Sequence, residues 1–337
     1  MSEADAVAAV LWLGATMYAV FGGADFGAGF WALVAGGGER GTRPRELIAW
    51  AIGPVWEANH VWLIFVLVVL WTAFSGAFAA IMSTLFIPLC LAALGIVLRG
   101  SGFAFQRVVT GAGERRLAEA AFAISSVLTP FFMGTVVGGI ASGRVPTGNA
   151  QGDAVTSWLN PVSLLIGVLF VATGAYIAAV FLVSDARRYG DPELERYFAN
   201  RALGAAVAAG AVAFAGIFVL RADARYIYDG LTSEALPLVL ASAAFGLGAL
   251  VLLWRGARRG VRPLAVGAVV AVIWGWGAAQ YPYLLPKTLK IADGAAPSET
   301  LTAVLIVFGV AVAVVLPSLG LLYTLSQRSV LEEEAEG

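Results

Sequence analysis

The sequence has very little of the chemistry that most enzymes use. Its 337 residues include a single cysteine, Cys90, and a single histidine, His60. These counts exclude a disulfide, a thiolate metal cluster and bis-histidine ligation of a haem within the chain. Charged residues make up only 13% of the sequence, about half the share of a soluble domain. The formal net charge is -1, so there is no basic excess to bind nucleic acid.

Long apolar segments fill almost all of the chain. Hydrophobic residues account for 60% of it and the mean hydropathy is +0.84. A membrane-spanning helix needs roughly 20 apolar residues. We therefore predict an all-α polytopic membrane protein with nine transmembrane helices. The predicted spans are residues 7–34, 48–74, 77–99, 118–142, 161–184, 200–220, 236–255, 262–281 and 301–326.

The predicted spans leave no room for a separate soluble domain. We expect residues 1–330 to form one transmembrane domain and residues 331–337 to be a disordered, acidic cytoplasmic tail containing Glu332, Glu333 and Glu334. The first span follows a short acidic start rather than the basic segment of a signal peptide. We therefore expect this span to stay in the membrane.

Basic residues are unevenly divided between the two sides of the predicted membrane domain. Of the 21 lysines and arginines, 16 fall on one side. They are Arg40, Arg43, Arg45, Arg99, Arg107, Arg115, Arg116, Arg187, Arg188, Arg196, Arg201, Arg255, Arg258, Arg259, Arg262 and Arg328. The other side has Arg144, Arg221, Arg225, Lys287 and Lys290. Because cytoplasmic loops carry the excess of basic residues, we predict an external N-terminus and a cytoplasmic C-terminus.

Two carboxylic acids lie inside predicted spans. Asp25 is about nine residues from the cytoplasmic end of the first span, and Glu57 is about ten residues from the cytoplasmic start of the second. At a rise of about 1.5 Å per residue, both lie roughly 14 Å from the inner surface. Ionisable residues at this depth are costly and suggest function. The sequence favours a proton relay from the cytoplasm over a purely structural polar cluster.

Three further polar residues are candidate supports for this relay. Asn59 and His60 follow Glu57 on the same predicted helix, and His60 shares its face because it lies three residues on. A histidine could pass protons, ligate a haem or only fix helix packing, and its type leaves these roles open. Arg99 could polarise the mouth of the path, although snorkelling to the membrane surface is the expectation that we favour.

Two segments resemble signatures of the cytochrome bd-type quinol oxidase subunit II family. The first is the glycine-rich stretch Gly22-Gly23-Ala24-Asp25-Phe26-Gly27-Ala28-Gly29. The second and more specific one is Gly53-Pro54-Val55-Trp56-Glu57-Ala58-Asn59-His60-Val61-Trp62-Leu63-Ile64. Weaker similarities include Arg99 with Gly102-Phe103, Thr129-Pro130-Phe131 and Tyr281-Pro282, so the resemblance extends over the full length.

The resemblance implies a fold, a reaction and partners. The nine helices would form two four-helix bundles plus one peripheral helix, in the plasma membrane of a bacterium. The complex would oxidise quinol and reduce dioxygen to water. Haems b and d would lie in the larger subunit I, so this chain would bind no cofactor or metal directly and would not be catalytic alone. A structural quinone, bound lipids and a small accessory subunit remain open.

The resemblance also gives Asp25 and Glu57 a role, since both match acids of the family's proton path. Glu57 stands where some relatives have aspartate, and His60 stands where others have glutamine, which argues against haem ligation by His60. Two alternatives remain. One is a proton- or ion-coupled secondary transporter or channel with both acids at a coupling-ion site, although no sequence repeat supports it. The other is a purely structural subunit of the oxidase.

Overall fold

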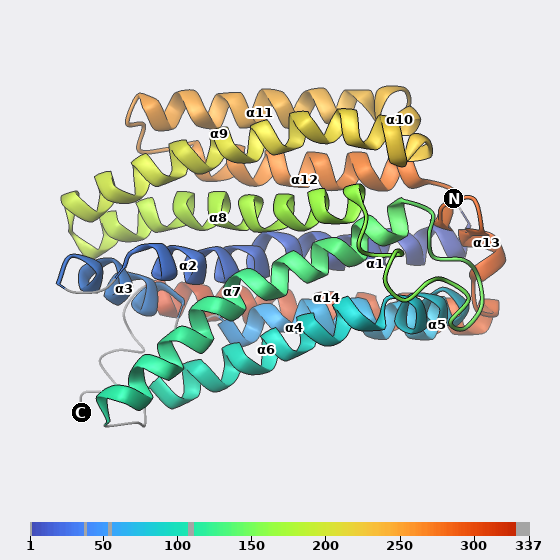
Figure 1. Cartoon of the computed structure of the whole chain (residues 1–337), viewed down its shortest axis with the longest axis horizontal. Coiled ribbons are helices and arrows are strands. Elements are labelled where there is room, and N and C mark those ends of the chain that lie inside the picture. Colours follow the sequence, from blue (N-terminus) through green and yellow to red (C-terminus); the bar gives the residue numbers. More distant parts are fainter. Residues whose placement is uncertain (1, 37–38, 53–55, 107–110, 328–337) are drawn as a thin grey trace.

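The computed structural model describes residues 2–36, 39–52, 56–106 and 111–327 and consists almost entirely of helices (Figure 1). The N-terminal part contains α1 (Glu3–Met17), the π-helical turn η1 (Tyr18–Gly22), α2 (Gly23–Val34), α3 (Glu39–Ile52), α4 (Trp56–Ala73), α5 (Ser75–Thr84), α6 (Phe86–Gln106) and α7 (Ala112–Ala141). The C-terminal part contains α8 (Pro161–Tyr189), α9 (Pro192–Asp223), α10 (Arg225–Thr232), α11 (Leu236–Trp254), α12 (Val261–Gln280), α13 (Ile291–Gly294) and α14 (Ser298–Gln327). The predicted acidic tail lies outside the described residues.

The only strands among the described residues form a small antiparallel sheet. Its strands are β1 (Tyr283–Leu285) and β2 (Leu289–Lys290). This sheet follows α12, which ends at Gln280 just before Pro282. Proline lacks the N–H that would continue the helix. The two short strands lie in the connection between α12 and α13, and the all-α fold class is confirmed.

The long helices lie side by side along the longest axis of the molecule (Figure 1). Consecutive helices form three antiparallel hairpins with extensive contacts, namely α6 with α7, α8 with α9, and α11 with α12. The helix α8 joins them at the centre, because it packs against α2 and α7 as well as α9. The largest hydrophobic cluster is built around this helix, where Ile177 and Ala179 are fully buried.

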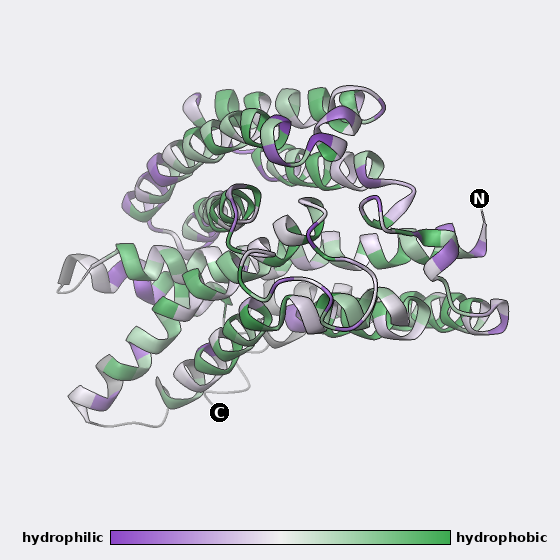
Figure 2. Cartoon of the chain, turned by 45° about the vertical axis from the view of Figure 1, so that its right-hand side comes forward, coloured by the Kyte–Doolittle hydropathy of each residue, from purple (hydrophilic) through white to green (hydrophobic). Residues whose placement is uncertain are grey.

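Seven described helices are long and apolar enough to cross a membrane. They are Glu3–Val34, Leu117–Ala141, Pro161–Tyr189, Pro192–Asp223, Leu236–Trp254, Val261–Gln280 and Ser298–Val315. An eighth is reached if the bent pair Asn59–Ala73 and Ser75–Thr84, which meet at 118°, counts as one span. Figure 2 shows hydrophobic residues, in green, along most of the length of the long helices. These features confirm a polytopic helical membrane protein.

The structure differs from the prediction of nine spans at the second and third predicted spans. Of the span expected at 48–74, the structure describes the part in α3 up to Ile52 and the part in α4 from Trp56. The span expected at 77–99 is interrupted at Leu85, between α5 and α6. The apolar part of α6, Phe86–Gly102, is shorter than the other candidates. A count of nine thus remains a prediction.

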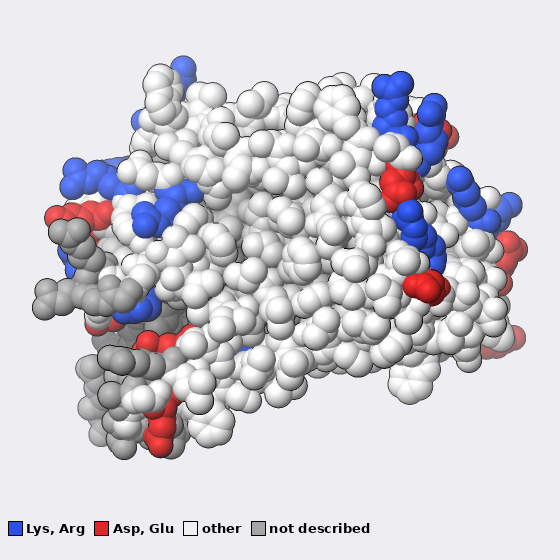
Figure 3. Space-filling view, in the orientation of Figure 1, with Lys and Arg blue, Asp and Glu red and all other residues white. Residues whose placement is uncertain are grey.

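Charged side chains gather at the two ends of the bundle. Figure 3 shows a wide uncharged band between blue and red clusters at opposite ends of the visible face. This band faces lipid with large apolar side chains, such as Phe214 and Phe218 on α9, which are 64% and 60% exposed. Charges at both ends and apolar groups between them match the needs of a bilayer-spanning domain.

The boundaries of the central hairpin follow from its capping residues. Asn160 caps α8 by accepting a hydrogen bond from the Ser163 amide at 3.0 Å. Asp191 caps α9 in the same way, accepting from the Glu193 and Leu194 amides. Both helices then begin with a proline, which fits a first helical position. Between them, Gly190 adopts φ 79°, the left-handed conformation that ends α8.

Gly27 allows α2 to approach α8 closely. A Cβ atom on Gly27 would overlap the backbone of Gly174 and lie 2.8 Å from the Ala175 nitrogen. The neighbouring Trp31 indole N–H donates to the Ala175 carbonyl at 2.8 Å. Gly27 therefore serves the close packing of α2 against α8.

Substitution of Gly27 by alanine is expected to destabilise the assembled complex by about 1–3 kcal/mol, because the added methyl group overpacks the contact between two backbones. The measurement is the midpoint of thermal unfolding. Gly210→Ala on α9 is the matched control, since no atom lies within 4 Å of its Cβ position. Equal midpoints for the two variants would contradict the packing role of Gly27.

Candidate functional site

The centre of the candidate site is the carboxylate of Asp25. This residue lies in the first turn of α2, directly after the π-helical turn η1. Such turns occur frequently at functional sites. Asp25 is only 4% exposed, and its Oδ2 accepts a hydrogen bond from the Asn59 side-chain amide of α4 at 2.8 Å. The structure thus brings the predicted residues Asp25 and Asn59 together in the interior of the bundle.

Arg99 of α6 binds the same part of α2. Its Nη2 donates to the backbone carbonyl of Asp25 at 2.8 Å, and its Nη1 donates to Ser126 Oγ of α7 at 2.5 Å. The guanidinium also lies between two aromatic rings, 4.8 Å from the centroid of Phe26 and 4.4 Å from that of Phe122. Hydrogen bonds and cation–π contacts therefore hold this cation on both sides.

The expectation that Arg99 snorkels to the membrane surface was wrong. The side chain is 1% exposed and is the largest fully buried one in the described part of the chain. A buried cation is costly unless it has partners, and those described above offset the cost. Coulombic attraction between Asp25 and Arg99 adds to them. Arg99 is therefore a buried, hydrogen-bonded member of the candidate site.

The sequence did not point to Ser126 and Phe122 as partners of Arg99. Both lie on α7, one turn apart, on the face that packs against α6 and α2. Gly29 completes the arrangement, because a Cβ atom there would overlap Ser126 and lie 2.9 Å from Arg99 Nη1. The available signal was a serine inside an apolar span, on the helix that directly follows the helix of Arg99.

His60 lies in α4 next to Asn59. Its ring contacts those of Tyr18 and Phe26 edge-on, with centroids 6.3 Å and 5.9 Å apart. Glu57 lies three residues before His60 in the same helix, so helical geometry places both on one face. The Glu57 side chain is outside the part of the chain that the structure describes. The predicted meeting of Asp25 and Glu57 is therefore left as a prediction.

His60 and Cys90 are the only histidine and cysteine in the sequence. The His60 Nε2 atom is buried, and the rings of Tyr18 and Phe26 contact the imidazole edge-on. Cys90 is exposed, on α6. Among the described residues, no three histidine, cysteine, aspartate or glutamate side chains form a group that could hold a metal ion.

Comparison with known proteins identifies the family. The family model for cytochrome bd terminal oxidase subunit II matches residues 4–326. The chain belongs to this family. It is therefore a membrane subunit of a cytochrome bd quinol oxidase, a respiratory quinol:O2 oxidoreductase.

Individual relatives agree with the family model. The chain is 22% identical over 320 residues to a Bacillus subtilis (strain 168) protein named as a cytochrome bd menaquinol oxidase subunit II, covering 91% of each chain. It is 27% identical over 221 residues to the cytochrome bd-I ubiquinol oxidase subunit 2 of Escherichia coli (strain K12), covering 62% of this chain and 55% of that one. Among solved structures, the bd oxidase from Geobacillus thermodenitrificans has a similar chain, with a TM-score of 0.77 and 27% identity, covering 96% and 98% of the two chains.

Proposed function

We propose that this subunit II provides a proton path that enters from the cytoplasm and passes through Asp25 and Glu57. The observation that carries the proposal is the hydrogen bond of 2.8 Å between Asn59 and the buried carboxylate of Asp25. It fixes that carboxylate between the first span and α4, the helix that also contains Glu57. A buried acid held in this way can take up and release a proton without moving.

The remaining polar residues act on this path indirectly. Arg99 holds the backbone of Asp25 through its carbonyl and is a positioning residue. Asn59 orients the carboxylate, and His60 lies one residue further along α4. Glu57 precedes Asn59 by two residues, so the two Cα atoms are about 3 Å apart along the helix axis and on different faces of α4. A link between Asp25 and Glu57 is part of the proposal, and the variants described below test it.

The membrane topology, the partner subunit and the substrate that we propose rest on the family and on the charge distribution. The subunit has nine spans in two four-helix bundles with one peripheral helix, an external N-terminus and a cytoplasmic C-terminus in a bacterial plasma membrane. Its partner is subunit I, which holds haems b and d and which it stabilises. Quinol is the substrate of the complex. The basic ends of α8 and α12 support the cytoplasmic assignment.

The proposal predicts that Glu57→Gln slows oxygen consumption of the assembled oxidase by roughly 10-fold or more, while the haem content is unchanged. Glutamine is nearly the size of glutamate and keeps its hydrogen-bonding capacity, but it cannot ionise. Oxygen uptake per haem, with haem counted from the visible absorption spectrum, is the measurement.

A matched control is Glu299→Gln, which makes the same change in the first turn of α14, near one end of the bundle. This variant is expected to run at the wild-type rate. If Glu57→Gln also runs at the wild-type rate, the acid serves hydrogen bonding only, and the subunit is a structural partner of subunit I. A colourless, functional protein without a haem-bearing partner would instead favour the transporter alternative.

A further inference from the structure

A cavity of about 240 Å³ lies at the end of the central helix α8. One wall is a single face of α8, formed by Val180, Val183, Ser184 and Arg187. The opposite wall is the turn between α11 and α12, residues 257–263. The cavity lies at one charged end of the bundle, far along the chain from the Asp25 site.

Ion pairs build the walls of this cavity. Arg187 pairs with Glu195 at 2.7 Å and donates to the carbonyls of Ala257 and Arg258. Arg262 pairs with Asp185 at 2.8 Å and donates to the Phe181 carbonyl. These bonds tie the α11–α12 turn to α8. The ion pairs occupy both carboxylates beside the cavity, Glu195 and Asp185. Asp185 also pairs with a second arginine, Arg188.

Arg258 and Arg259 have no acidic partner among the described residues. Both line the cavity and are exposed. The segment from Arg255 to Pro263 contains four arginines and no acid. By contrast, Arg43 at the start of α3 has two acidic partners, Asp191 and Glu193. Positive charge is therefore uncompensated at the α11–α12 turn.

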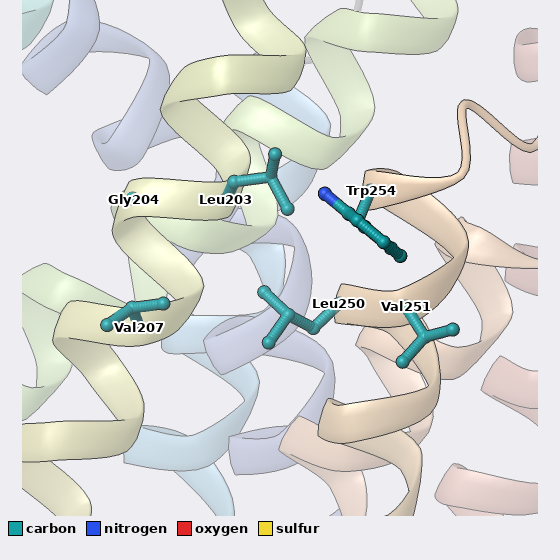
Figure 4. A pocket seen from close by; sticks show the side chains of 6 residues that line it. All are labelled: Leu203, Gly204, Val207, Leu250, Val251 and Trp254. Atoms are coloured by element: carbon teal, nitrogen blue, oxygen red, sulfur yellow. The ribbon is translucent and has the colours of Figure 1, made fainter.

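The surface next to this cavity is apolar and faces lipid. Figure 4 shows a groove between α9 and α11 in which side chains from the two helices face each other. The groove is lined by Leu203, Gly204, Val207, Leu250, Val251 and Trp254, with a volume of about 590 Å³. Trp254 is 76% exposed and precedes the cavity segment by only three residues. An aromatic side chain beside arginines is typical of the interface between acyl chains and headgroups.

We propose that the cavity binds the phosphodiester headgroup of an anionic phospholipid, with Arg258 and Arg259 as the ligand-binding side chains. The walls are preformed by the Arg187 and Arg262 bonds, so the site exists before the lipid binds. The two exposed guanidiniums supply the charge that an anionic headgroup complements. The apolar groove beside Trp254 accommodates an acyl chain, which a free phosphate ion lacks. The inference is independent of the proton path.

The test is a titration of the purified, assembled oxidase in mixed micelles of detergent and phosphatidylcholine with increasing phosphatidylglycerol, followed by the midpoint of thermal unfolding. The wild type is expected to gain stability as phosphatidylglycerol is added, because a ligand that binds only the folded state stabilises it. The double variant R258Q/R259Q is expected to need roughly 30-fold more phosphatidylglycerol for the same gain. Unchanged haem content shows that it is assembled.

The matched control is R221Q/R225Q, which removes two exposed arginines from the other end of α9 and the start of α10. This variant should respond to phosphatidylglycerol as the wild type does. Equal responses of R258Q/R259Q and the wild type would overturn the proposal. A second arm adds inorganic phosphate to the oxidase in mixed micelles of detergent and phosphatidylcholine. If phosphate gives the same gain, and R258Q/R259Q abolishes it, the site binds a soluble anion and the lipid assignment is wrong.

Discussion

Asp25→Asn is expected to lower oxygen consumption per haem by roughly 100-fold in the assembled oxidase. Asparagine keeps the shape of the side chain and can still form a hydrogen bond with Asn59, which now binds the carboxylate at 2.8 Å. It cannot take up and release a proton. Because the substitution also leaves the buried Arg99 without an opposite charge, the yield of complex is expected to fall as well. The loss of turnover is therefore measured as oxygen uptake per haem with excess quinol, a ratio that does not depend on the yield.

The control for this prediction is Asp185→Asn. Asp185 is also buried, at 7% exposure, but it lies near the end of α8, where it pairs with Arg188 and Arg262. Its replacement can weaken those ion pairs and lower the unfolding midpoint, but turnover per haem should stay within about twofold of the wild type. Full turnover in Asp25→Asn would reject the relay and leave Asp25 a packing residue.

The membrane fold could be predicted from composition because lipid imposes a simple rule on sequence. A span needs an apolar run of sufficient length, and such runs match α8, α9, α11, α12 and α14 closely. The rule gives no signal for a break inside an apolar run, and the interruption at Leu85 lies inside the span predicted at 77–99. The bend of 118° after Ala73 coincides with the gap between the spans predicted at 48–74 and 77–99, although hydropathy gives no angle for it.

The site was predictable in part for a similar reason. Asp25 stands out as an acid in an apolar segment, and its depth suggested a neighbour on the next helix, which the Asn59 hydrogen bond provides. The position of Arg99 was not predictable, because an arginine near the end of a span normally extends to water. Burial depends on three groups from other helices, Ser126, Phe122 and the Asp25 carbonyl. Their convergence is a property of the tertiary structure.

Replacing Arg99 by glutamine is expected to give the largest loss of stability in this subunit, about 3–5 kcal/mol. The substitution removes the cation whose Nη2 donates to the Asp25 carbonyl and whose Nη1 donates to Ser126. The Asp25 carboxylate would then be buried without an opposite charge. The measurements are the yield of haem-containing complex and its unfolding midpoint. Arg221→Gln, at an exposed position on α9, is the control and should change neither.

A second variant separates the charge of Arg99 from its packing. In Asp25→Asn/Arg99→Gln both members of the buried pair are neutral, so no uncompensated charge remains. Replacing a buried ion pair by neutral groups is far less costly than breaking it. The double variant should therefore regain at least half of the stability that Arg99→Gln loses, while its turnover stays as low as that of Asp25→Asn. If the two losses of stability simply add, Arg99 supports the site through its packing on Phe26 and Phe122 and not through its charge.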